Sequence, residues 1–278
     1  MKKLIGLGCS WTVGEGAYPN EIWQQYNGNC RAYPATENDY FFRPYALENS
    51  WVSVLCRDYL PNYAPVNLGE RGTGIRGAVN QLHLTDEVDW EHDTGIICLM
   101  LPHLSRINLF SKKKWKNYNW RTLSNAPTAT LGPGNECWDD IWTKEFYDEA
   151  VACHEAALAI YTAQLFAERY NFKFIFANAY FEHCSFHDYF VTHNVNKALM
   201  KRINWSNYFP THKEDYASFV DKLTQLDGIL PENVHYFGFY QKLSWPATYL
   251  TNCCHPTLQG QKVIAKELHR FMMDNNYF

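Results

Sequence analysis

The sequence lacks a long apolar run. No stretch of about 18 consecutive apolar residues occurs among its 278 residues, so we expect no membrane span. The first eight residues, Met1 to Gly8, begin as a signal peptide does, with two lysines and then apolar residues. However, no apolar region of about 7–15 residues follows. We therefore recognise no signal peptide, interpret this start as a buried strand and expect a cytoplasmic protein.

An excess of positive charge is also missing. The chain has 25 Lys and Arg against 29 Asp and Glu, a formal charge of −4, so we expect no nucleic-acid partner. The one basic run, 112–116, contains Trp115 and is interpreted as a solvated loop. No segment matches a P-loop or a G-x-G-x-x-G that opens a helix. This disfavours a flavodoxin-like nucleotide binder, the most distant of the alternatives.

Regular cysteine spacing is absent as well. The nine cysteines are an odd number without a C-x-x-C pair, and only Cys253 and Cys254 are adjacent. Zinc ribbons and disulfide frameworks both need more regular spacing. The simplest interpretation is a set of free, mostly buried thiols in a reducing compartment.

One histidine cluster raises the question of a metal. His183 and His187 have the spacing of two ligands on one helical face, and His193 follows, with Glu182 and Asp188 beside them. The segment shows no helical apolar stripe, and a third ligand is not specified. We interpret these residues as solvated histidines, and we expect no metal and no organic cofactor.

The apolar residues indicate alternating strands and helices. Thr94 to Leu101 is continuously apolar, as in a parallel strand covered on both faces. No regular element is assigned over 17–46, and Pro256 suits the first turn of the last helix. The predicted strands are 3–7, 64–68, 94–101, 172–177 and a weaker 234–237, and the predicted helices are 50–59, 75–84, 139–170 and 257–272.

This alternation predicts an α/β fold, a doubly wound, flavodoxin-like parallel sheet of about five strands. Without repeats or a low-complexity linker, the chain is expected to form a single domain over 1–278. Two aromatic-rich or irregular insertions are predicted at about 103–137 and 181–231. In such folds the functional site lies at the carboxyl ends of the strands. This rule selects the segments that follow the predicted strands and the loop before the last helix.

Ser10 and His255 are the candidate reactive pair. Ser10 follows the first predicted strand, within a loop of small residues, and His255 precedes the last helix. A serine hydroxyl becomes a good nucleophile when a neighbouring base takes its proton, and histidine is the usual base. We therefore expect the two side chains to lie together, although 245 positions separate them (255 − 10).

The stretches around these residues resemble the SGNH (GDSL-like) hydrolase family. Gly8-Cys-Ser-Trp-Thr-x-Gly-x-Gly is similar to its G-D-S block, and His255-Pro-Thr-x-x-Gly to its last block, D-x-x-H-P-x-x-x-G. The sequence Asn67-Leu-Gly-Glu-Arg-Gly72 is similar to its N-x-G-x-x-G block. The resemblance implies an oxyanion site built from the backbone N–H groups of Ser10 and Gly72, and such donors often contribute most to catalysis.

Two blocks depart from the family pattern. The family has G-x-N-D after the third strand, where this chain has Leu101-Pro-His-Leu-Ser-Arg106 without an asparagine. His103 is our first choice for the missing oxyanion donor, with Ser105 and Arg106 as alternatives. Asn252 stands where the family has an aspartate. An asparagine can orient His255 but cannot stabilise its imidazolium as a carboxylate does.

The resemblance implies a serine esterase. The expected substrate is an ester, such as an O-acyl group of a carbohydrate or a small lipid-like ester, with Ser10, His255 and Asn252 as the catalytic set. The alternative is a non-catalytic protein that keeps the SGNH fold for binding or for structure. Similar compact chains occur in phages and bacteria, so a virion location and assembly into an oligomer or a virion stay open. The two departures from the family pattern favour this alternative.

Overall fold

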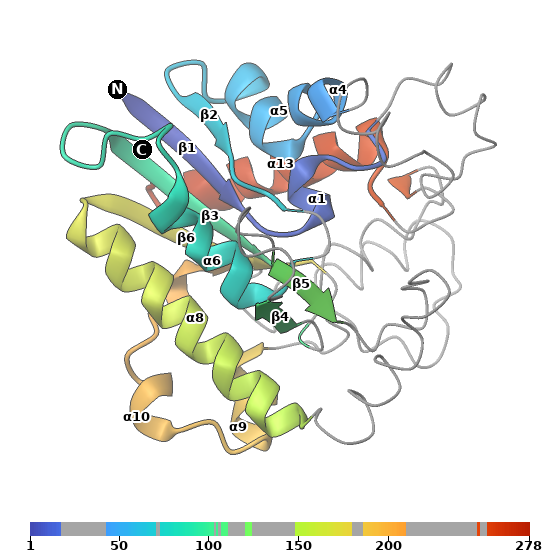
Figure 1. The fold of residues 1–278 in the computed structure, drawn as a ribbon. Helices are drawn as coiled ribbons and strands as arrows, with labels where there is room; N and C mark the ends of the chain where they lie inside the picture. The colour runs from blue at the N-terminus through green and yellow to red at the C-terminus, as the bar shows by residue number, and fades with distance from the viewer. Residues whose placement is uncertain are drawn as a thin grey trace, which may run out of the picture.

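The computed structural model describes residues 1–17, 43–70, 73–102, 104, 107–110, 120–123, 148–179, 186–209, 249–250 and 255–278. Five strands form one parallel sheet in the order β2-β1-β3-β6-β7 (Figure 1). They are β1 (Lys2–Leu7), β2 (Ala64–Asn67), β3 (Thr94–Leu101), β6 (Phe172–Asn178) and β7 (Tyr208–Phe209). A separate antiparallel hairpin joins β4 (Ile107–Phe110) to β5 (Trp120–Leu123). The prediction of a doubly wound α/β sheet of about five strands is confirmed.

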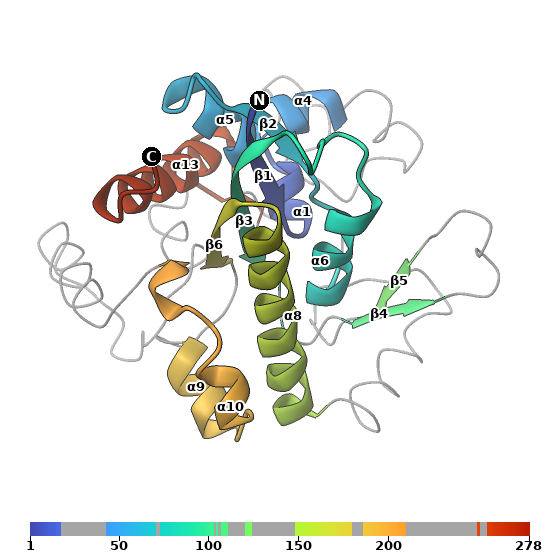
Figure 2. The same ribbon diagram turned by 90° about the vertical axis from the view of Figure 1, so that its left-hand side faces the viewer.

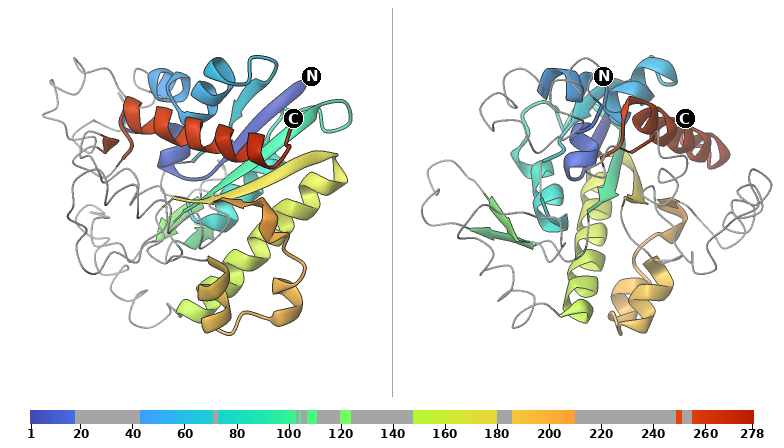
Figure 3. Two further views of the ribbon diagram at one scale, coloured as in Figure 1. Left: turned by 180° about the vertical axis from the view of Figure 1, so that it is seen from behind. Right: turned by 90° about the vertical axis from the view of Figure 1, so that its right-hand side faces the viewer.

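Helices cover both faces of the sheet. One face carries α5 (Trp51–Asp58) and α13 (Leu258–Asp274), and the other carries α6 (Ile75–Leu84) and α8 (Glu149–Arg169) (Figures 1 and 3). Each face has its own core of buried apolar side chains. The remaining described helices are α1 (Ser10–Val13), α4 (Arg43–Glu48), α9 (Phe186–Thr192), α10 (Lys197–Met200) and the 3₁₀ turn η4 (Trp205–Asn207).

The strand register brings the ends of the central strands to one edge. Ile5 of β1 is level with Val66 of β2 and with Ile97 of β3, which in turn is level with Phe174 of β6. All four strands are parallel, so their carboxyl ends meet where α1 follows β1 (Figure 1). The sequence rule for such sheets expects the functional site at this edge.

The fifth strand of the described sheet is one that was not predicted. It is β7, which pairs with β6 so that Phe176 is level with Tyr208, whereas the predicted strand 234–237 lies outside the described residues and stays a prediction. The segment 181–231, predicted as an insertion, therefore contains a strand of the main sheet. A strand of two residues is too short to show the apolar alternation from which strands are predicted.

Two helix starts differ from the prediction, and one described helix was not predicted. The helix predicted to start at 139 begins at Glu149, because Asp148 is extended and its side chain caps the helix by accepting from Val151 N. Pro256 precedes the last helix and does not form its first turn, since Thr257 is the N-cap. Finally, α4 begins at Arg43, inside the segment to which no element was assigned.

Helix α8 is the one element among the described residues whose length and composition would suit a membrane span. In this structure α8 packs along β6 and α6 (Figure 2). Its buried residues, including Cys153, Ala156, Ile160 and Ala163, belong to the core on that face of the sheet. Burial against the sheet accounts for these residues, while Val151, Leu158 and Leu165 of the same helix are exposed.

Candidate active site

Ser10 is the first residue of a short helix at the carboxyl end of β1, an interior strand of the sheet. Its side chain is buried, with 4% of the residue exposed. The backbone turns sharply on either side: Gly8 has φ +152° and Gly14, which ends α1, has φ +92°. Residues that carry a side chain rarely adopt such φ angles, which explains the glycines of this loop. Among the described residues no acceptor pairs with the Ser10 backbone N–H, as expected at the start of a helix.

His255 reaches Ser10 from the opposite end of the chain. Its Nε2 lies 2.9 Å from Ser10 Oγ. Thr257 holds this segment in place: its side chain caps α13 by accepting from Gly260 N, and its backbone N–H donates to Tyr249 O at 2.9 Å. A Cβ on Gly260 would collide with the same carbonyl group. The structure thus brings together the two residues that the sequence paired, at hydrogen-bond distance.

Asn67, in the second family-like block, ties the loop after β2 to the Ser10 helix. Its Nδ2 donates to Thr12 O at 2.7 Å and to Ser50 Oγ at 3.0 Å, and its Oδ1 accepts from Gly69 N at 3.0 Å. In addition, Glu70 N donates to the carbonyl oxygen of Gly8 at 2.9 Å. The block therefore runs directly beside the turn that carries Ser10.

The remaining predicted site residues lie outside the described part of the chain. These are Gly72, predicted as an oxyanion donor, Asn252, predicted to orient His255, and His103 with its alternatives Ser105 and Arg106. Their roles stay predictions. Among the described strands, β3 ends at the edge where Ser10 lies, at Leu101, two residues before His103.

Glu15 was missed in the sequence analysis. Its Oε2 lies 3.1 Å from His255 Nε2, the same nitrogen that contacts Ser10. The His255 and Glu15 side chains are 16% and 15% exposed. Glu15 stands in the unspecified position between Gly14 and Gly16, and a carboxylate one turn after a candidate nucleophile was the available signal.

Gln261 was missed as well. It is fully buried, and its side-chain amide joins two helices: Oε1 accepts from Trp51 N at 2.8 Å, and Nε2 donates to Trp11 O at 3.2 Å. The amide thus links α13, which follows His255, to α1, which carries Ser10. A polar residue on the apolar stripe of α13 was the sequence signal, since buried polar groups are paired.

Glu70 is the carboxyl group near this loop whose ionisation is clearly perturbed. Burial raises the pKa of Glu70 above its usual value, while a hydrogen bond from Gln81 and the charge of Arg43 act in the opposite direction. The Gln81 Nε2 to Glu70 Oε2 distance is 3.1 Å. Burial dominates because removing a carboxylate from water costs more than these two interactions return.

The predicted histidine cluster is only partly described. His183 and the side chain of His187 lie outside the described residues. His193 Nδ1 lies 2.9 Å from Tyr189 O, and its Nε2 lies 3.7 Å from Glu149. Within the described residues no group of three or more histidine, cysteine or acidic side chains is arranged to hold a metal. Four cysteines, Cys9, Cys56, Cys98 and Cys153, are described, and all are free and buried.

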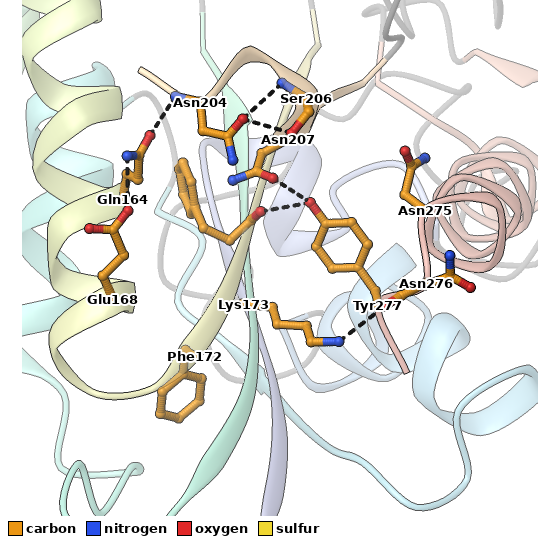
Figure 4. A pocket seen from close by; sticks show the side chains of 11 residues that line it. Gln164, Glu168, Phe172, Lys173, Asn204, Ser206, Asn207, Asn275, Asn276 and Tyr277 are labelled. Atoms are coloured by element: carbon orange, nitrogen blue, oxygen red, sulfur yellow. Dashed lines mark hydrogen bonds between the residues drawn. The ribbon is translucent and has the colours of Figure 1, made fainter. Parts of the chain in front are cut away.

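Figure 4 shows a pocket whose lining residues include neither Ser10 nor His255. This pocket of about 370 Å³ is lined by polar groups of α8, the start of β6, η4 and the chain end. Phe172, which lines it, is level with Gly95 and so lies at the amino end of the sheet. Its polar groups pair with one another: Tyr277 OH contacts Asn207 Oδ1 at 2.8 Å, and Lys173 Nζ donates to Asn276 O at 3.1 Å. The pocket is separate from the Ser10–His255 pair.

Comparison with known proteins gives similarity at the level of structure alone. No protein-family model and no curated protein matches the chain. Similar solved structures include a member of the lipolytic protein G-D-S-L family from Veillonella parvula, with 11% identity, TM-score 0.37 and 97% of both chains covered. Another is a mutant of an acetyl-xylooligosaccharide esterase from Geobacillus, with 14% identity, TM-score 0.41 and 98% and 94% covered. A third is a carbohydrate acetylesterase family member from Sinorhizobium meliloti, with 13% identity, TM-score 0.38 and 98% of both chains covered. At these values the matches carry no functional assignment, so the proposal below rests on the side chains of this protein.

Proposed function

We propose that this protein is a serine ester hydrolase of the SGNH type, with Ser10 as the nucleophile and His255 as its base. The observation that carries the proposal is the 2.9 Å contact between His255 Nε2 and Ser10 Oγ at the carboxyl edge of the sheet. A base must reach the proton that it removes within about 3 Å. The pair meets this requirement. Both side chains are largely buried and lie at the carboxyl edge of the sheet, where α/β proteins place their sites.

The reaction follows from this geometry. Ser10 Oγ attacks the ester carbonyl carbon while its proton moves to His255 Nε2. The carbonyl oxygen becomes an oxyanion, to which the Ser10 N–H and, by resemblance, the Gly72 N–H donate. The leaving alkoxide takes the proton from Nε2, which leaves an acyl group on Ser10. Water then attacks this acyl group and gives its proton to Nε2. The proton finally returns to Ser10 Oγ as the acid departs.

The proposal also covers the substrate class and the roles of two further residues. The substrate class we favour is an O-acyl group of a carbohydrate or a small lipid-like ester. Asn252 orients His255, and His103 supplies the third oxyanion donor. The steps above use side chains and backbone groups of this chain, so the proposal calls for no metal or organic cofactor, no nucleic acid and no membrane span. We propose that the protein is located in the cytoplasm or in a virion.

A fluorophosphonate probe tests the nucleophile directly, because it bonds covalently to an activated serine. The wild type, Ser10→Ala and Ser206→Ala are treated with the probe and weighed intact. Ser206 is an exposed serine on η4 and serves as the matched control. We expect one adduct on the wild type and on Ser206→Ala and none on Ser10→Ala. Hydrolysis of p-nitrophenyl acetate should fall by roughly 10⁴-fold or more in Ser10→Ala alone.

The opposite result would replace the proposal. If the wild type takes no adduct and hydrolyses the ester no faster than Ser10→Ala, the enzyme assignment is wrong. The non-catalytic alternative, a binding or structural protein with this fold, would then stand. With activity present, rates on p-nitrophenyl esters of increasing chain length and on O-acetylated sugars separate the two proposed substrate classes.

A further inference from the structure

The carboxylate of Glu15 is held beside the reactive pair by the backbone of the Ser10 loop. Glu15 N donates to the carbonyl oxygen of Ser10 at 3.0 Å, which fixes the residue one turn after the serine. Gly16, with φ +96°, then turns the chain so that a Cβ there would lie 2.9 Å from His255 Cβ. The contact between Glu15 and His255 is therefore set by the local fold, on a short segment packed against both partners.

His255 Nε2 thus faces two oxygen atoms, Ser10 Oγ at 2.9 Å and Glu15 Oε2 at 3.1 Å. When Nε2 carries no proton, its lone pair faces the negative carboxylate, which is unfavourable. When Nε2 carries a proton, it donates to that carboxylate in a charge-assisted hydrogen bond. The carboxylate consequently favours the state in which the proton of Ser10 has moved to Nε2, and most strongly the imidazolium, which has the opposite charge.

We propose that Glu15 is a positioning residue that stabilises the His255 imidazolium through Nε2, in place of the carboxylate that the sequence lacks at Asn252. This inference rests on the proposed function. In the acylation step Ser10 Oγ bonds to the acyl carbon, its proton passes to Nε2, and the imidazolium N–H stays within reach of Glu15 Oε2. The proton does not stay on Glu15, because it must leave on the departing alkoxide.

Glu15→Gln removes the charge and keeps the shape and a hydrogen-bond acceptor. We expect kcat for p-nitrophenyl acetate to fall about 10- to 100-fold, the loss that corresponds to one charge-assisted hydrogen bond, with KM changed less than twofold. Glu15→Asp restores the charge and should recover part of the rate. Glu48→Gln, which neutralises an exposed carboxylate on α4, is the matched control and should keep the wild-type rate.

A second measurement does not depend on esterase activity. Two-dimensional ¹⁵N–¹H spectra of the histidine rings show which ring nitrogen carries the proton, and a His255→Gln spectrum assigns the signals. The active ring keeps Nε2 free to accept the Ser10 proton, so we compare populations: in Glu15→Gln we expect a smaller share of rings protonated on Nε2 than in the wild type, and a larger share protonated on Nδ1 alone. A change in packing alone would not move the proton from one nitrogen to the other.

The two measurements separate the two proposals. If the wild type is active but Glu15→Gln changes neither kcat nor the ring spectrum, the role of Glu15 is wrong and the Ser10 enzyme stands. If the spectrum changes as expected in a protein without esterase activity, the pairing of Glu15 with His255 is supported and the proposed function is wrong. A rate lost equally in Glu15→Gln and Glu15→Asp, with an unchanged spectrum, would reduce Glu15 to a structural residue.

Discussion

Replacing Gln261 by methionine removes the polar link between the two halves of the candidate site. Methionine matches the length of glutamine but has no amide, so Trp51 N and Trp11 O both lose their side-chain partner. Gln261 is fully buried and both bonds are direct, at 2.8 Å and 3.2 Å. Little space is therefore available for water to replace the amide, so Trp51 N would be left without its acceptor and Trp11 O without this donor.

The size of the effect follows from these two groups. Leaving the buried Trp51 N–H unsatisfied costs about 1–3 kcal/mol, and losing the bond to Trp11 O costs about 0.5–1.5 kcal/mol, so the two together cost about 1.5–4.5 kcal/mol. The extra apolar surface of methionine returns about 1 kcal/mol. We expect a net loss of about 0.5–3.5 kcal/mol, against the stability of about 5–15 kcal/mol that is usual for a folded protein. Esterase activity per folded molecule should also fall about tenfold or more, since small misplacements of reacting groups are costly.

Urea unfolding followed by tryptophan fluorescence measures the stability term. The matched control is Lys262→Met, the same introduced side chain at the next position of α13, where the native residue is exposed. A surface change of this kind should alter stability by less than about 0.5 kcal/mol. If Gln261→Met is no less stable than Lys262→Met, then the amide does not hold the two helices together and the reasoning fails.

Two more predictions concern the same region. Gly16→Ala places a Cβ at φ +96° within 2.6 Å of Pro256 O and 2.9 Å of His255 Cβ, so it should cost about 1–3 kcal/mol of stability and lower the esterase rate per folded molecule. The control is Gly95→Ala, which is strained at φ +153° but remote from His255, and which should lower stability without changing the esterase rate per folded molecule. Equal esterase rates for Gly16→Ala and Gly95→Ala would contradict the prediction. Glu70→Gln tests the raised pKa of Glu70. Because this pKa is raised in the folded state, the Glu70 side chain contributes stability at low pH, and this contribution is lost as pH rises through the folded-state pKa. Because Glu70 is partly exposed, we expect the Gln variant to be more stable than the wild type by only about a few tenths of a kcal/mol at pH 7.5, and equally stable at pH 4. Urea unfolding at both pH values measures this difference, and an equal gain in stability at both would refute the prediction.

Local chain patterns were sufficient for most of the fold. The run from Thr94 to Leu101 is apolar throughout because β3 is covered on both faces, and the predicted and observed bounds of this strand agree. The helix at Trp51 begins after Ser50, a residue type that caps helices. The order of the two outermost motifs also placed Ser10 and His255 at one edge of the sheet, since parallel strands end together.

Tertiary contacts decided the rest. Strand β7 has two residues and exists because β6 offers it a free edge, which no local period records. Glu15 and Gln261 are ordinary polar residues in the sequence, and their partners lie 240 and 210 to 250 positions away (255 − 15, 261 − 51 and 261 − 11). The sequence by itself determined which residues form strands, helices and the nucleophile loop, because those depend on neighbours a few positions apart. Only the packing of α13 against α1 and α5 decided that His255 faces both a serine and a carboxylate, because the direction of a side chain depends on atoms that the chain brings close only by folding.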